Sequence, residues 1–240
     1  MIRSALIVLV SLLAACANLD KSQLDTGMPG LNVASAALAG GSPEIALRVT
    51  NGILAKQPNN VPALLSQGDA LSALGRLNEA KASYTQALVA DPHSAMAQME
   101  LGRLDLRSDP AHAQVLFLQA LQHDPSNTTA LNDLGIAYDL QGDHANAQTA
   151  YRKALGTDST MRAAEVNLAL SMALSGQAPE AVRLLTPIAN APNAPRRVRD
   201  DYAAALAITG DKAAAAKILS ANLTPDQTER AVQGYGEFSQ

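Results

Sequence analysis

The chain has 240 residues, of which 48% are hydrophobic and 3% aromatic, and its 18 basic and 22 acidic side chains give a net charge of −4. This balance lacks the basic excess that a nucleic-acid-binding protein needs, so no nucleic acid is expected as a partner. The single cysteine, Cys16, excludes an intramolecular disulfide.

The first residues are typical of a targeting segment rather than of folded structure. Arg3 supplies a positive start, and the apolar residues 5–13 are too few to cross a bilayer as a helix. Residues 13–16, Leu-Ala-Ala-Cys, resemble the bacterial lipoprotein signal, in which cleavage leaves the cysteine first and its thiol carries lipid such as palmitate. We therefore predict a signal peptide at residues 1–15 and lipidation of Cys16. An ordinary secretory signal with an incidental cysteine is the alternative.

The residue after Cys16 bears on where the anchored protein resides. Lipoproteins held at the inner membrane often carry Asp there, whereas this chain carries Ala17, so the resemblance implies the outer membrane, at its periplasmic face. Several acyl chains on one residue anchor a protein stably. The polar stretch that follows contains Gly27, Pro29 and Gly30. It predicts a lipidated N-terminus and flexible tether over residues 16–30.

A repeat of 33 or 34 residues runs through the rest of the chain. It is marked by alanines at Ala46, Ala80, Ala113, Ala147, Ala181 and Ala215. Small residues precede these alanines by 11 or 12 positions, at Ala34, Gly68, Gly102, Gly135, Ala169 and Ala203. Other residues follow them by four, at Thr50, Tyr84, Phe117, Tyr151, Leu185 and Leu219. A fixed period of this size indicates small structural units that stack to share a core.

Each unit is expected to form two helices joined by a tight turn. In the clearest unit, apolar residues recur at helical spacing over residues 62–74 and 77–90. Gly75 lies between them and suits the left-handed position just past a helix end. Asp91, which precedes a proline, ends the second helix. The small residues are expected where the two helices cross closely, and Tyr84 is expected to fill the wedge toward the next unit.

The segments at residues 65–92 and 131–159 resemble tetratricopeptide (TPR) repeats. The resemblance implies an all-α fold, a right-handed helix-turn-helix solenoid of about six repeats over residues 31–229. The units are expected at about residues 27–60, 61–94, 95–127, 128–161, 162–195 and 196–229. The third unit is one residue short, which predicts an altered turn near residues 107–113. Residues 230–240 are expected to be a frayed C-terminal tail.

Arrays of this family bind other proteins along a concave face lined by the first helix of each unit. The side of these helices opposite the packing residues gives a candidate peptide-binding groove formed by Asn32, Asp69, Met96, Met99, Arg103, Asn132, Ile136, Asp139, Asn167, Leu170 and Asp200. Its mixture of apolar and hydrogen-bonding groups suits an extended peptide or a helix. In peptide-binding relatives an asparagine placed like Asn167 often bonds the ligand backbone. A plain solvated helix face is the alternative, with the methionines as core filler.

No catalytic, cofactor or metal site is predicted. The four histidines, His93, His112, His123 and His144, do not pair with each other or with Cys or Glu at metal-ligand spacing. Asp105 and Asp109 come close to His112 in sequence, but at a turn. Phosphate-loop and nucleophile-elbow motifs are also absent. We therefore expect neither an enzyme nor a protein with a small-molecule substrate.

Three segments in order, residues 131–155, 166–189 and 196–219, resemble the TadD family, outer-membrane TPR lipoproteins of the tight-adherence (Flp) pilus assembly system. The resemblance implies a pilotin-like adaptor whose partner is a secretin or another pilus assembly protein, bound through the concave face. The alternatives are a type IV pilus pilotin and an outer-membrane scaffold lipoprotein for barrel assembly or for cell-wall hydrolases.

Overall fold

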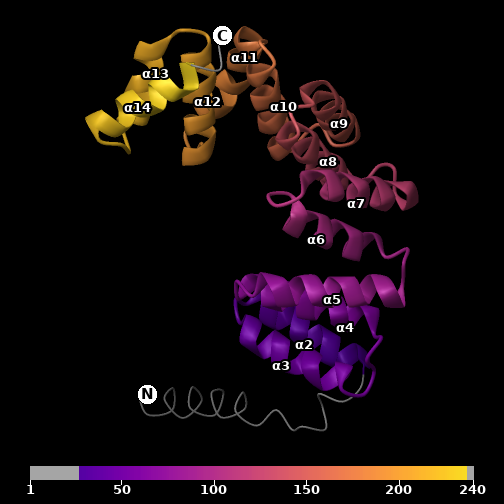
Figure 1. Ribbon diagram of the computed structural model, residues 1–240. Helices are drawn as coiled ribbons and strands as arrows, with labels where there is room; N and C mark the ends of the chain where they lie inside the picture. Colours follow the sequence, from indigo (N-terminus) through magenta and orange to yellow (C-terminus); the bar gives the residue numbers. More distant parts are fainter. Residues whose placement is uncertain (1–26, 237–240) are drawn as a thin grey trace, which may run out of the picture. The chain divides into compact units, whose positions relative to one another are not determined.

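The computed structural model describes residues 27–236, and within them the chain forms thirteen helices and no strand (Figure 1). The helices are α2 (Gly27–Ala39), α3 (Pro43–Leu54), α4 (Val61–Ala73), α5 (Leu77–Ala90), α6 (Ala95–Asp105), α7 (Pro110–His123), α8 (Thr128–Leu140), α9 (His144–Thr157), α10 (Arg162–Leu174), α11 (Ala178–Ala189), α12 (Arg196–Ile208), α13 (Lys212–Leu219) and α14 (Pro225–Gly236). The all-α expectation is confirmed.

Consecutive helices form six helix-turn-helix pairs, with α14 as an additional helix after the sixth. We call α2, α4, α6, α8, α10 and α12 the first helices, and α3, α5, α7, α9, α11 and α13 the second helices. The chain divides into two compact units, residues 1–101 and 102–240, and the boundary falls inside α6. In the first unit α4 packs on α3 and α5, and in the second α8 packs on α7 and α9.

Glycines end five of the first helices, as the repeat predicts. Gly41, Gly75, Gly142, Gly176 and Gly210 all have positive φ, between 69° and 91°. This left-handed conformation costs glycine little, because it has no Cβ. The next residue then bonds back across the turn: the Arg76 N–H donates to the Leu71 carbonyl at 2.9 Å. Such a bond satisfies one of the carbonyls that a helix end leaves without an intrahelical partner.

The third pair turns without a glycine, which confirms the altered turn expected there. The Asp109 N–H donates to the Asp105 carbonyl at 2.7 Å, and the Asp109 carboxylate accepts from the His112 N–H at 3.0 Å. Asp109 is therefore the N-cap of α7.

The two helices of a pair meet through a small residue on the first and a larger one on the second. Three pairs combine glycine with an aromatic ring: Gly68 with Tyr84, Gly102 with Phe117, and Gly135 with Tyr151. A Cβ added to Gly102 would lie 2.8 Å from Cε1 of Phe117, and one added to Gly68 or Gly135 would overlap the tyrosine ring. In the other three pairs these two positions hold a buried alanine and a buried non-aromatic residue: Ala34 and Thr50, Ala169 and Leu185, Ala203 and Leu219.

The ring of Tyr84 packs on Gly68 of its own pair. That it also fills the wedge toward the next pair stays a prediction. The next pair is met by smaller side chains, since Ala87 of α5 clusters with Ala97 of α6.

Both ends of the array differ from expectation. Residues 27–30, assigned to the tether, begin α2, because Leu31 and Val33 pack into the core of the first pairs and proline is tolerated in a first helical turn. Residues 230–236, assigned to the frayed tail, belong to α14, because Val232 is buried and Tyr235 packs beside it. The signal peptide, Cys16 and the last four residues lie outside the described residues.

Candidate functional site

Side-chain hydrogen bonds join three first helices through residues of the second unit. Arg103 of α6 donates from Nε to Oδ2 of Asp133 on α8 at 2.7 Å. Oδ1 of Asp133 accepts from the Asn132 side chain at 3.2 Å, and Oδ1 of Asn132 accepts from Nδ2 of Asn167 on α10 at 2.9 Å. We call these four residues the polar ladder. It links α6, α8 and α10, so it fixes the side chains of successive first helices relative to one another.

The middle of the polar ladder is buried and its two ends are not. Asn132 and Asp133 are 6% and 7% exposed, whereas Arg103 and Asn167 are half-buried. The Asp133 carboxylate is neutralised by the guanidinium and receives two hydrogen bonds, which is what a buried charge requires. The ends therefore offer polar groups to a ligand, while the middle holds them in position.

Asp139 is a second polar centre, at the C-terminal end of α8. Its carboxylate accepts from the Tyr151 hydroxyl at 2.9 Å and from Ser171 Oγ at 2.6 Å, and it lies 2.8 Å from His144 Nδ1. These partners come from α9 and α10, so Asp139 joins the fourth pair to the fifth. Because the Asp139 carboxylate already has three partners, we infer that it stabilises the packing of the repeats and does not bind a ligand.

Four candidate groove residues lie in the first unit. Asn32 and Asp69 are exposed, and Met96 is 54% exposed. Asp69 accepts a hydrogen bond from the Tyr84 hydroxyl at 2.8 Å. Met99 is buried, which corrects its assignment to the groove: it belongs to the core, as the core-filler alternative for the methionines proposed.

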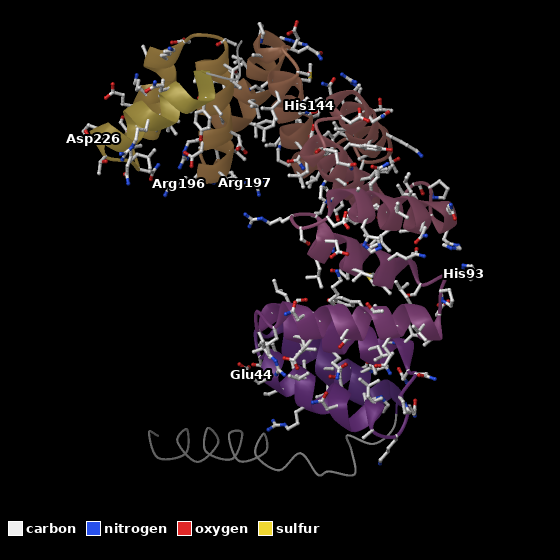
Figure 2. All side chains as sticks on the ribbon, viewed as in Figure 1. Glu44, His93, His144, Arg196, Arg197 and Asp226 are labelled. Atoms are coloured by element: carbon white, nitrogen blue, oxygen red, sulfur yellow. The ribbon has the colours of Figure 1, made fainter. Side chains whose placement is uncertain are left out.

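The remaining candidates lie in the second unit. Ile136 and Leu170 are half-buried and pack against its largest apolar cluster. Asp200 pairs with Arg196 at 3.3 Å at the beginning of α12, the end of this helix at which Figure 2 labels Arg196 and Arg197. Asn132, like Met99, is buried and needs correction, because it supports Asn167 from within the polar ladder instead of facing a ligand.

Sequence reasoning missed Asp133 and Ser171. Asp133 follows Asn132 on α8, and this polar pair between Leu131 and Leu134 was the available signal. Ser171 gives no such signal, because its role depends on Asp139, 32 residues away in the chain.

The described residues provide no obvious metal chemistry. No three His, Cys, Asp or Glu side chains come close enough in residues 27–236 to hold an ion. His112 lies 2.8 Å from the buried carboxylate of Asp105, across the turn between α6 and α7. Asp109 is used in the same turn as a helix cap, so this group serves the local fold. No helix within the same residues is long and apolar enough to span a bilayer.

Comparison with known proteins agrees with the repeat. Residues 65–108 and 107–162 match the family model described as Tetratricopeptide repeat. The FK506-binding protein-like protein of Homo sapiens is 36% identical over 73 residues, which is 30% of this chain and 21% of that protein. The chain thus spans about a fifth of the length of the curated relatives it matches.

Solved structures match over more of the chain. A crystal structure of MamA is 26% identical and covers 67% of this chain and 88% of its own, with a TM-score of 0.58. PilF of Pseudomonas aeruginosa covers 89% of this chain and 98% of its own with a TM-score of 0.73. Its sequence identity is 15%, so this likeness concerns the fold alone.

TPR proteins are generally non-catalytic scaffolds that bind other proteins. The helix pairs, the glycine turns and the family match over residues 65–162 agree with the TPR fold. Residues 65–162 therefore carry tetratricopeptide repeats, and residues 27–236 have the all-helical fold of a TPR solenoid, which in other proteins serves as a scaffold for protein–protein interaction.

Proposed function

We propose that this protein is a lipid-anchored adaptor at the periplasmic face of the outer membrane, where it binds a secretin or another component of a pilus assembly machine. The observation that carries the proposal is the Leu-Ala-Ala-Cys motif at residues 13–16, placed ahead of described residues that form six helix pairs and α14. Such a chain combines an anchor with a protein-binding surface, and the helices of residues 27–236 form no separate catalytic domain.

The pilus assignment rests on the resemblance of residues 131–155, 166–189 and 196–219 to the TadD family. A surface on α6, α8 and α10 supports the proposal that such an adaptor binds a partner there. Arg103 and Asn167 present a cation and an amide at the ends of the polar ladder, and half-buried Ile136 and Leu170 add apolar area on α8 and α10. Hydrogen-bonding groups beside apolar side chains suit a peptide segment of a partner.

The anchor is tested by replacing its attachment point. Cys16→Ser should abolish incorporation of labelled palmitate and move the protein from the membrane fraction to the soluble periplasm. Ala17→Ser, next to the cysteine, is the matched control and should keep both label and membrane location. Equal labelling of Cys16→Ser and the unaltered protein would contradict lipidation.

The partner is tested in a strain that lacks the gene. Secretin multimers in the outer membrane and surface pili should both fall, and the gene supplied in trans should restore them. Normal multimers and pili in the deletion strain would contradict the pilus role, and would leave the repeats and the anchor to serve another machine.

The surface is tested by Arg103→Ala combined with Asn167→Ala, which should lower secretin multimers without releasing the protein from the membrane. Because both side chains belong to the polar ladder, circular dichroism must show that the variant is folded at the growth temperature. Arg162→Ala is the matched control, since Arg162 is an exposed residue of α10 that pairs with Glu165 on the same helix. Wild-type multimer levels in the double variant would exclude this surface.

A type IV pilus pilotin is the second candidate, and the fold shared with PilF supports keeping it. A scaffold for barrel assembly or for cell-wall hydrolases is the third. Crosslinking from the anchored protein distinguishes the three, because each names a different partner: the secretin of one pilus system or the other, or a barrel-assembly or hydrolase component.

A further inference from the structure

The last two helices enclose a groove that belongs to neither the polar ladder nor the proposed partner surface. It lies between α13 and α14 in the second unit and has a volume of about 900 Å³. Its floor is apolar, formed by Ala213 and Ala216 of α13 together with Leu223 and Val232. This volume is within the range of protein binding pockets.

The groove arises because the sixth pair is built differently from the others. Its second helix, α13, has 8 residues, whereas α5, α7 and α9 have 14. A five-residue link then leads into α14, which packs on α12 and α13. The last pair of a repeat array needs a polar outer face if it is to remain solvated. Here that face is a hollow floored by alanines, which allow another helix to approach closely.

The charges on the two walls are of opposite sign. Lys212 and Lys217 line the groove from α13, and Glu229 lines it from α14. All three are exposed, and within residues 27–236 none of them forms an ion pair. Each wall therefore presents charge that a partner of the opposite pattern would neutralise.

We propose that two copies of this chain associate through this groove, with α14 of each copy lying in the groove of the other. In a two-fold dimer the same surface patch of both copies forms the interface. If one residue of the first copy contacts a second residue of the partner, the two-fold axis generates the same contact with the copies exchanged. The groove-facing side of α14 carries Glu229, so an α14 helix laid along the partner's α13 brings Glu229 to the lysines. The two-fold axis repeats this contact.

Sedimentation velocity on the full-length chain over about a hundredfold range of concentration tests association. The unaltered protein should shift from monomer to dimer. Glu229→Lys and Lys217→Glu should each weaken association at least about tenfold, because each places like charges across the two-fold axis. Asp226→Lys makes the same charge change at the beginning of α14, on a residue outside the groove lining, and should leave association unchanged (Figure 2). Circular dichroism should show equal helix content in all variants.

Mixing the two single variants is the sharpest step. Glu229→Lys carries two positive charges at positions 217 and 229, and Lys217→Glu carries two negative charges there. Neither variant should therefore self-associate as the unaltered protein does, but the mixture should form a heterodimer. The variant with both changes on one chain should also recover dimerisation. The proposal is overturned if the unaltered protein stays monomeric throughout, as it would if the groove takes a different protein or a small molecule. It is also overturned if the charge reversals leave association unchanged, or if mixing restores nothing.

Discussion

Asn167 donates a hydrogen bond from Nδ2 to Oδ1 of Asn132, at 2.9 Å. The asparagine expected to bind a ligand backbone is thus held by a buried amide from the preceding first helix. Asn132 is held in turn by Asp133, which is neutralised by Arg103. An amide fixed in this way loses less rotational freedom on binding than a mobile one, which favours affinity. The ladder therefore connects the packing of the repeats with the chemistry of their surface.

The Arg103–Asp133 pair should stabilise the second unit measurably. Asp133→Ala removes the acceptor of two hydrogen bonds, and Arg103→Ala leaves a buried carboxylate with only Asn132. Arg103 is partly exposed, so solvent screening reduces its effect, and we expect a loss of about 1–2 kcal/mol of unfolding free energy for each variant. A double-mutant cycle by urea denaturation should give a coupling energy of about 1 kcal/mol. Strictly additive single effects would show that the pair is not coupled.

Gly135→Ala should destabilise the protein by about 1–3 kcal/mol, because the new methyl group overlaps the Tyr151 ring. Gly156→Ala is the matched control: Gly156 lies in α9 of the same pair, with nothing within 4 Å of an added Cβ. This control should stabilise the protein by up to about 1 kcal/mol, since alanine has a higher helix propensity than glycine. Adding Tyr151→Leu to Gly135→Ala recreates the combination at Ala169 and Leu185 and should recover part of the loss. Thermal melts in which both glycine variants behave alike would contradict the contact.

Ala147→Leu should have a local effect. Ala147 is fully buried where α9 packs in the second unit, and overpacking there costs about 1–3 kcal/mol. Since stability in a repeat array is shared between neighbouring repeats, hydrogen exchange should increase first in α8 and α9. Exchange that rises evenly over the helices of the second unit would show that this unit unfolds as a whole.

The sequence alone is sufficient for the architecture because the repeat encodes local geometry. Gly75 and Gly142 predict the turns between their helices, since the left-handed residue after a helix end is usually glycine. Close helix crossings are predicted by Gly68, Gly102 and Gly135, each of which is followed by an aromatic residue 15 or 16 positions later. These features depend on neighbours within one repeat, where chain spacing determines spatial spacing.

The candidate site is harder to predict because its contacts join different repeats. Met99 and Asn132 are on the expected helices, but whether they face solvent depends on the neighbouring pair, and both are buried. Asp139 resembles an exposed groove residue in sequence, yet Ser171 from the next first helix contacts it. At the N-terminal end, Gly27 and Pro29 indicate a tether, but the burial of the residues that follow them extends α2 back to Gly27.

The Tyr151 hydroxyl should make stability fall at alkaline pH. Burial raises the pKa of Tyr151 well above its ordinary value, and the nearby Asp139 carboxylate raises it further. A phenol whose pKa is higher in the folded state stabilises the fold fully below the unfolded pKa of about 10. Above that pH the unfolded chain ionises first, so unfolding free energy should fall by about 1.4 kcal/mol per pH unit for this group. Burial also raises the pKa of Tyr84 in the first unit, so the Tyr84 hydroxyl should likewise lower the unfolding free energy as the pH rises.

Tyr151→Phe should cost about 1 kcal/mol of unfolding free energy at pH 7 through the lost hydrogen bond to Asp139. Phe117 shows that a ring without a hydroxyl fits the equivalent position. In urea titrations between pH 8 and 11, this variant should lose stability less steeply than the unaltered protein. Parallel pH profiles for the two proteins would show that the Tyr151 hydroxyl does not stay protonated in the folded state.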